Sequence, residues 1–139
     1  MLHTQGDVAE WAFPADPMAV RRARAAVRAQ LAAWDLDDLA DITILLVSEL
    51  VTNALRHASG PIGVRLVHPE TACGALLVEV SDPLPDPPRA RTAAPDDEGG
   101  RGLQLVAGAS RRWGTRPGGA TTGGTTGGKT VWFELALPD

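Results

Sequence analysis

The chain has 139 residues, of which 44% are hydrophobic, so it is long enough for one domain with its own core. A formal net charge of −4 argues against an electrostatic nucleic-acid interface, and the single cysteine, Cys73, excludes an intramolecular disulfide. No apolar run approaches the roughly 18 residues that a membrane span needs, and the first residues lack the apolar stretch of a signal peptide. We therefore expect a soluble, cytoplasmic protein of one domain, residues 1–139.

The beginning of the chain predicts a strand and a helix. Residues before Val8, with His3 among them, are expected to form a tail, and Val8 to Phe13 alternates enough for a strand. Asp16 followed by Pro17 is typical of a helix start, with Asp as the N-cap and Pro at the first helical position. The helix is expected to continue to Trp34 and carries the one locally basic segment, RRARAAVR. Its arginines are expected on the solvated face, or as part of a partner surface.

A second helix is predicted from the segment DLDDLAD to about residues 58–60. Acidic residues in its first turn suit the positive end of the helix dipole. Apolar residues at helical spacing are expected to face a core: Leu39, Ile42, Leu45, Leu46 and Leu50.

The middle of the chain predicts two strands and a long loop. Ile62 to Val67 alternates, and Ala75 to Val80 is apolar enough for a central strand. The segment 83–98 contains five prolines and almost no large apolar residues, so it is expected to be an irregular loop. A loop of this length inside a compact domain usually serves as a lid or is disordered.

The last third predicts a short helix, 102–109, and a hairpin of strands 111–116 and 130–137. A flexible Gly/Thr loop, 117–128, is expected between the two strands. The order of elements predicts an α/β sandwich in which a mixed sheet is covered on one face by about three helices. Four tryptophans are expected to pack in the core and on the sheet, since they are not interleaved with basic residues as in a base-stacking platform: Trp11, Trp34, Trp113 and Trp132.

Three polar residues lie four positions apart in the segment SELVTNALRHA: Glu49, Asn53 and His57. This spacing places them on one face of a helix. A carboxamide oxygen can ligate a hard cation, and a carboxylate can orient or deprotonate a hydroxyl, so the pair suits a Mg²⁺–nucleotide site. The alternatives are that Asn53 bonds a backbone carbonyl, that Glu49 is a solvated charge, and that His57 is structural. Arg56 either reaches phosphate or faces solvent.

Two further motifs carry polar or glycine residues at element ends. Asp82 ends the apolar strand in VEVSDP, where a carboxylate alternatively caps a turn. In EGGRGLQLV, Gly100 and Gly102 flank Arg101 at a helix start, where backbone N–H groups attract phosphate. The alternative is that the glycines only form the turn and that Arg101 faces solvent.

With these motifs in this order, the chain resembles the GHKL ATPase superfamily, which includes gyrases and histidine kinases. More narrowly, it resembles anti-sigma-factor serine kinases and related small ATP-binding regulators of actinobacteria. The N box of the family matches Glu49 to His57, the first glycine box begins at Asp82, and the second runs from Gly99 to Leu103. The closing strand begins at Gly128, and the resemblance extends from about residue 10 to the end.

The resemblance implies the ATP-binding (Bergerat) fold and a role for each matching residue. Glu49 would be the general base or orienter of the accepting hydroxyl, Asn53 the Mg²⁺ ligand, and Asp82 the acceptor for the adenine amino group. Segment 83–98 would be the ATP lid. The residues implied around the nucleotide phosphates are Gly100, Arg101, Gly102, Leu103 and Thr130. The sequence departs from the family at Pro83-Leu84-Pro85, where glycines are expected after the aspartate.

The implied function is that of an ATP- and Mg²⁺-binding regulator, a serine/threonine kinase for an antagonist protein and/or a protein that sequesters a sigma factor. A homodimer is compatible with the family, and neither nucleic acid nor a membrane is expected as a direct partner. The alternative is a non-catalytic, protein-binding module that retains or has lost ATP binding. The altered residues after Asp82 favour the alternative slightly, whereas the intact Glu49 and Asn53 oppose it.

One motif is rejected. Gly123 to Thr130 reads GGTTGGKT and matches the P-loop pattern. A P-loop needs a helix directly after it, but the residues that follow, VWFELALPD, are β-forming, and a Gly/Thr repeat produces such a match easily.

Overall fold

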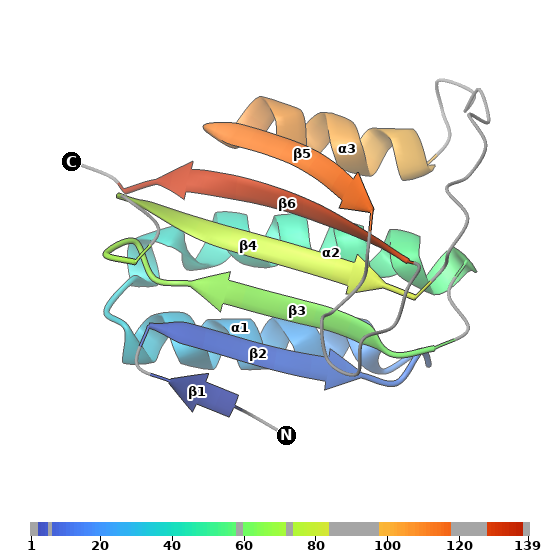
Figure 1. Cartoon of the computed structure of the whole chain (residues 1–139), viewed down its shortest axis with the longest axis horizontal. Helices are drawn as coiled ribbons and strands as arrows, with labels where there is room; N and C mark the ends of the chain where they lie inside the picture. Colours follow the sequence, from blue (N-terminus) through green and yellow to red (C-terminus); the bar gives the residue numbers. More distant parts are fainter. Residues whose placement is uncertain are drawn as a thin grey trace.

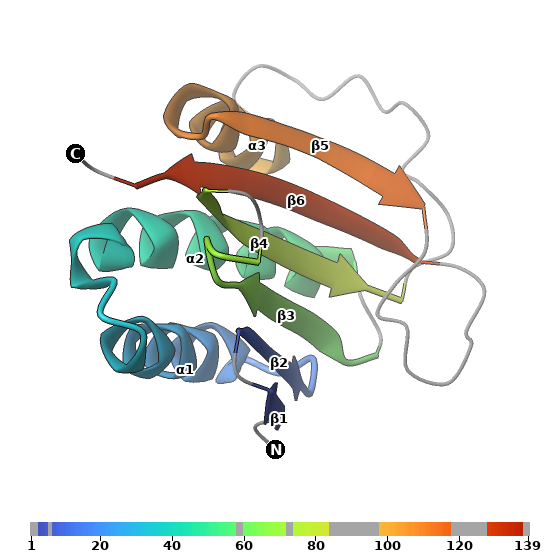
Figure 2. The same cartoon turned by 60° about the vertical axis from the view of Figure 1, so that its left-hand side comes forward.

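The computed structural model forms one sheet with helices on one side. Figures 1 and 2 show α1, α2 and α3 on the same face of the sheet. The structure describes residues 3–5, 7–57, 60–71, 74–83, 98–117 and 128–137. Its elements are β1 (His3–Gln5), β2 (Val8–Phe13), α1 (Ala19–Ala33), the 3₁₀ helix η1 (Asp37–Leu39), α2 (Ala40–His57), β3 (Ile62–Val67), β4 (Ala75–Asp82), α3 (Glu98–Ala109), β5 (Arg112–Pro117) and β6 (Lys129–Ala136).

The predicted α/β sandwich is confirmed, with one correction in the sheet. The strand order is β1-β2-β3-β4-β6-β5, and each pairing between these strands is antiparallel rather than mixed. Two successive helices between β2 and β3 return the chain to the end of the sheet where β2 stops, so β3 runs antiparallel to β2. A single helix separates β4 from β5, which therefore point the same way (Figure 1), but β6 lies between them.

The N-terminal part of the chain differs from the prediction in two places. The expected tail contains β1, which pairs with β2 at the sheet edge. A strand of three residues carries too little pattern to be recognised in a sequence. The first regular helix begins at Ala19 rather than Pro17, but the Asp16 carboxylate still accepts a hydrogen bond from the Met18 N–H at 2.8 Å. Asp16 therefore caps the turn that leads into α1.

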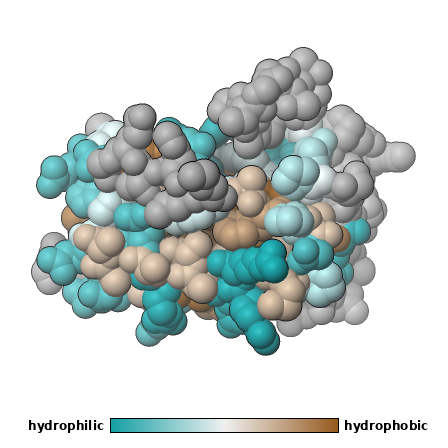
Figure 3. All heavy atoms as spheres, turned by 90° about the horizontal axis from the view of Figure 1, so that it is seen from below, coloured by the Kyte–Doolittle hydropathy of each residue, from teal (hydrophilic) through white to brown (hydrophobic). Residues whose placement is uncertain are grey.

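The basic segment of α1 lies on its solvent side, as predicted. Arg21, Arg22, Arg24 and Arg28 are all exposed. Figure 3 views the molecule from the side of α1 and β1, where hydrophilic side chains are interspersed with weakly hydrophobic ones. Arg28 lies 3.7 Å from Asp41, but both side chains are largely exposed, so this pair contributes little stability.

The core lies between the sheet and the helices. Alternate residues of β4 and β6 face it, among them Val78 and Phe133, both fully buried. On α2, most of the predicted core positions are buried or pack against the core, but Leu45 is 46% exposed. The buried row of α2 runs through Leu46 and Leu50, whereas Leu45 belongs to the neighbouring row that continues to Glu49. The expectation that Leu45 faces the core is therefore wrong.

The third helix, in contrast, begins earlier than predicted. Helix α3 starts at Glu98 rather than Gly102, so the glycine run lies inside its first turns. Glycine is a poor helix former, which is why the helix was predicted to begin only at Gly102, the last glycine of the run. The predicted loops lie largely outside the described residues, namely 84–97 of the expected lid and 118–127 of the Gly/Thr loop. Among the described helices, none is long and apolar enough to cross a membrane.

Candidate functional site

The elements that carry the motifs converge at one end of the sheet. The C-terminal half of α2, the end of β4 and the start of α3 lie at the same end in Figure 1. Helix α2 packs against both β4 and α3. The antiparallel topology produces this arrangement, because β4 and α2 both run toward the end at which α3 starts. Three motifs that are far apart in the sequence therefore share one region.

Glu49 and Asn53 lie on the same half-buried row of α2. They follow the exposed Leu45 at intervals of four residues, and the fully buried Val47 and Val51 belong to the core side of the helix. This position leaves both polar groups at the border between core and surface. Asn53 also makes an interaction within the chain, as does Arg56. The side chain of His57 lies outside the described part of the structure.

Other polar residues of α2 are satisfied by their own helix. The hydroxyl of Thr43 donates to the Leu39 carbonyl and that of Ser48 to the Ile44 carbonyl, each at 2.6 Å. These hydroxyls are buried, so the local hydrogen bonds remove the cost of burying them. Glu49 is therefore distinguished from its neighbour Ser48 by its half-exposed position on the row that carries Asn53.

Asp82 is the last residue of β4 and is only 6% exposed. It alternates with Val78 and Val80, which belong to the core, so its carboxylate lies on the face of the sheet that carries the helices. Asp82 pairs with Lys129 across the ladder and makes an interaction within the chain. A buried carboxylate at a strand end, on the same side as α2, is suited to accept a hydrogen bond from a ligand.

The residue after Asp82 contacts the segment after α2. A Cβ added at Gly60 would lie 3.0 Å from Cγ of Pro83, so the glycine backbone and the proline ring are closely packed. This contact joins the end of α2 to the end of β4. In the sequence, Gly60 is marked only as a glycine near the end of the predicted helix, and its contact with Pro83 depends on the fold.

The glycine run at the start of α3 offers backbone N–H groups to a ligand. Gly100 lies in the first turn of α3, where backbone N–H groups have no partner within the helix, whereas Gly102 is the fifth residue of the helix and lies beyond that turn. The side chain of Arg101 lies outside the described part of the structure. Leu103 is half-buried and packs against the core, and Val106 is fully buried one turn later. These two residues anchor α3 in the core, where the helix packs mainly against α2.

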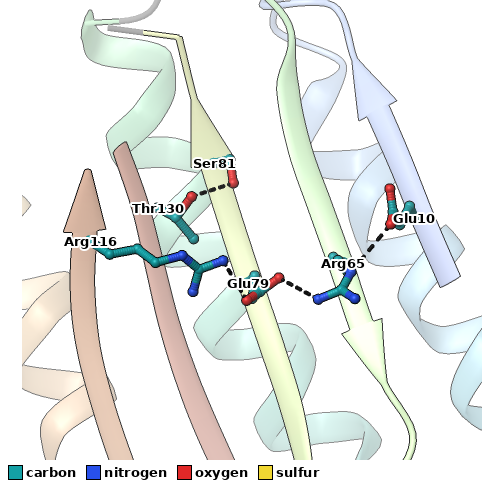
Figure 4. Close-up of polar contacts among 6 residues, drawn as sticks. All are labelled: Glu10, Arg65, Glu79, Ser81, Arg116 and Thr130. Carbon is teal, nitrogen blue, oxygen red and sulfur yellow. Dashed lines mark hydrogen bonds and ion pairs between the residues drawn. The ribbon is translucent and has the colours of Figure 1, made fainter. Parts of the chain in front are cut away.

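The structure does not bring Thr130 together with the other candidate residues. Thr130 pairs with Ser81, and their hydroxyl oxygens lie 2.8 Å apart (Figure 4). Both belong to the outer face of the sheet, opposite to the helices, because they are offset by one residue from Asp82 and Val131. The alternation of the apolar residues Val131, Phe133 and Leu135 in the sequence already predicts that Thr130 lies on the opposite face of the strand. The implied phosphate contact of Thr130 stays a prediction that the orientation of its side chain does not favour.

The described residues of the rejected P-loop pattern, 128–130, lead into a strand, as predicted. Gly128 adopts a positive φ of 91°, and Lys129 and Thr130 begin β6 rather than a helix. Within the described residues, no three His, Cys, Asp or Glu side chains gather as a potential metal cluster.

A sequence model of the histidine kinase-like ATPase domain matches residues 13–132. The match covers most of the chain, and the chain belongs to this family. The resemblance to the GHKL ATPases is therefore confirmed, and membership supports ATP binding and a kinase or ATPase type of activity.

A solved structure supports the fold. The chain is similar to the RsbU and RsbW domains of Rv1364c from Mycobacterium tuberculosis, with a TM-score of 0.57 and 19% sequence identity. The similarity covers 94% of this chain and 32% of that chain, so the present chain spans about a third of the length of the relative. The search of curated proteins found no match.

Proposed function

We propose that the chain binds Mg²⁺-ATP and transfers the γ-phosphoryl group to a serine or threonine of an antagonist protein, that it sequesters a sigma factor, or that it does both. The observation that carries the proposal is the position of Glu49 and Asn53 on one half-buried row of α2, at the end of the sheet where Asp82 and the first turns of α3 also lie. The family membership and the RsbW domain in the similar structure support it.

The donor groups fit the ligands that the proposal requires. The Asn53 carboxamide supplies a hard oxygen of the type that Mg²⁺ prefers, and Mg²⁺ commonly completes its shell with phosphate oxygens and water. The backbone N–H groups at the start of α3 suit phosphates. The buried Asp82 carboxylate suits an exocyclic amine such as that of adenine. When bound, Mg²⁺ would supply charge neutralisation for the triphosphate.

In this proposal the chain's own groups mainly position the reactants. Phosphoryl transfer requires little covalent chemistry from the protein. The Glu49 carboxylate, half-buried and one turn before Asn53, orients the accepting hydroxyl and takes up its proton. Glu49 is the catalytic residue of the proposal, and Asn53 and Asp82 are the principal ligand-binding residues.

A second candidate function is that of a non-catalytic, protein-binding module. The observation that favours it is the proline after Asp82, which packs against Gly60 and restricts the backbone where the family has glycines. In that case partner binding alone would carry the regulation. In either case the proposed partners are proteins, and a homodimer and a cytoplasmic location are part of the proposal.

The nucleotide-binding part of the proposal is tested by calorimetric titration of the chain with a non-hydrolysable ATP analogue, with and without Mg²⁺. We expect Mg²⁺-dependent binding that Asn53→Ala abolishes or strongly weakens. Absence of binding at millimolar nucleotide would overturn the kinase proposal and leave the protein-binding module. The substitution Thr52→Ala is a matched control, because Thr52 is exposed and adjacent in sequence to Asn53.

A further inference from the structure

A buried glutamate lies in the middle of the sheet on the face that carries no described helix. Glu79 of β4 is 6% exposed, and both of its carboxylate oxygens are engaged (Figure 4). Arg65 Nη1 donates to Oε1 at 2.9 Å, and Arg116 Nη2 donates to Oε2 at 2.7 Å. Arg65 also donates through Nε to Glu10 at 3.2 Å. The carboxylate of Glu79 is therefore the centre of a charge network that spans the outer face.

The contact with Arg116 crosses a strand. Arg116 lies on β5, Glu79 lies on β4, and β6 separates the two strands in the sheet. The arginine pairs with Thr130 of β6 in the ladder and extends past it to reach Glu79. This ion pair therefore joins two strands that share no backbone hydrogen bonds, over a sequence separation of 37 residues.

Each of the two strands leads to one side of the proposed nucleotide site. Three residues after Glu79, β4 ends at Asp82, the proposed adenine ligand. Strand β5 follows α3 after only Ser110 and Arg111, and α3 provides the N–H groups proposed for phosphate. Arg111 is held on β6, because its N–H donates to the Glu134 carbonyl at 2.7 Å and its guanidinium to the Glu134 carboxylate at 3.2 Å.

We propose that Glu79 and Arg116 are positioning residues for the nucleotide site. Their ion pair holds β5, and through the short connection also α3, at a fixed place relative to β4 and Asp82. This inference rests on the proposed function, because it assigns the adenine and the phosphates to these two sides. A purely stabilising role of the ion pair would not distinguish between the two parts of the nucleotide.

The test compares ATP with adenosine as ligands of the full chain. Arg116→Ala removes the ion pair between β5 and β4 but leaves β5 paired with β6 and Asp82 on β4. We therefore expect a displacement of β5 and α3 that lowers ATP affinity about five- to tenfold, while adenosine affinity changes less than about twofold. Glu79→Gln should act in the same direction without creating a cavity. Arg116→Lys retains the charge and should recover part of the ATP affinity.

Arg112→Ala is the matched control. Arg112 is exposed on the same strand and makes no ion pair with any residue in the described part of the chain. Its substitution should leave both affinities unchanged. Calorimetry gives the affinities, and thermal melting and far-UV circular dichroism establish that each variant is folded.

Four results would overturn the inference. Equal losses of ATP and adenosine affinity, or a lower melting temperature with unchanged ATP affinity, would mean that the ion pair only stabilises the sheet. Failure of the unsubstituted chain to bind ATP would overturn the proposed function and this inference with it. Binding by the unsubstituted chain but no selective loss in Arg116→Ala or Glu79→Gln would overturn the inference alone.

Discussion

Gly60 and Pro83 join the two ends of the candidate site by direct packing. A side chain at position 60 would begin 3.0 Å from Cγ and 3.7 Å from Cβ of Pro83. Gly60 comes three residues after α2, which carries Asn53, and Pro83 comes directly after Asp82. The proline that departs from the family pattern therefore has a defined neighbour, and it fixes the backbone next to Asp82.

Substituting Gly60→Val should weaken nucleotide binding. The branched side chain must displace Pro83, and overpacking of this kind costs about 1–3 kcal/mol. We expect a lower melting temperature and a loss of ATP affinity that exceeds the loss seen with Gly60→Ala. Gly108→Ala serves as the control, because nothing lies within 4 Å of an added Cβ there. Unchanged ATP affinity in Gly60→Val would show that the Gly60–Pro83 contact does not position Asp82.

Glu49→Gln separates binding from transfer. The amide retains the shape of Glu49 but cannot accept the proton of a hydroxyl, so phosphorylation should fall by about 10²-fold or more. ATP affinity should change little, because Asn53 and Asp82 are intact. The measurement is phosphate transfer from labelled ATP to a partner protein, together with calorimetry. Full regulation of a partner by the Glu49→Gln variant would favour the non-catalytic module.

Local patterns in the sequence predicted much of the fold. The bounds of β3 agree with the alternation of Ile62 to Val67, and β4 extends the predicted strand by two residues. The N-box helix is confirmed because its apolar residues recur at helical spacing over 18 residues. Long periodic segments of this kind are the ones that a single sequence specifies best.

The remaining features depend on partners that are distant in the sequence. Nothing near Glu79 indicates that it meets Arg65 and Arg116, because these contacts arise only from the order of the strands. Trp113 is 40% exposed, contrary to the expected packing, because β5 is an edge strand. In contrast, the candidate site residues on α2 and β4 stand in motifs whose spacing is local, so the sequence alone predicts them.

Gly114→Ala should destabilise the sheet. An added Cβ would lie 2.8 Å from Cζ2 of Trp132, a separation that requires the indole ring to move. We expect a loss of about 1–3 kcal/mol in the free energy of unfolding. By the same measurement of chemical denaturation, the control Gly108→Ala should be neutral or stabilising by up to about 1 kcal/mol, because alanine is the better helix former. Equal stability of the two variants would contradict the close packing of Gly114 and Trp132.

Thr130→Val tests whether Thr130 stabilises the outer face of the sheet or contacts the nucleotide. Thr130 is 1% exposed, and its hydroxyl shares a hydrogen bond with Ser81 on the face away from the helices. Valine retains the shape but leaves the buried Ser81 hydroxyl without this partner, which should cost about 1–3 kcal/mol of stability.

The double variant Thr130→Val with Ser81→Ala should recover part of that loss, because neither position then buries an unpaired hydroxyl. ATP affinity should be unchanged in both variants, since Asp82 lies on the opposite face of the same ladder. A selective loss of ATP affinity in Thr130→Val, with stability unaffected, would instead support the phosphate contact that the family resemblance implies. Chemical denaturation and calorimetry on the unsubstituted chain, the single variant and the double variant decide between a structural role and a phosphate contact.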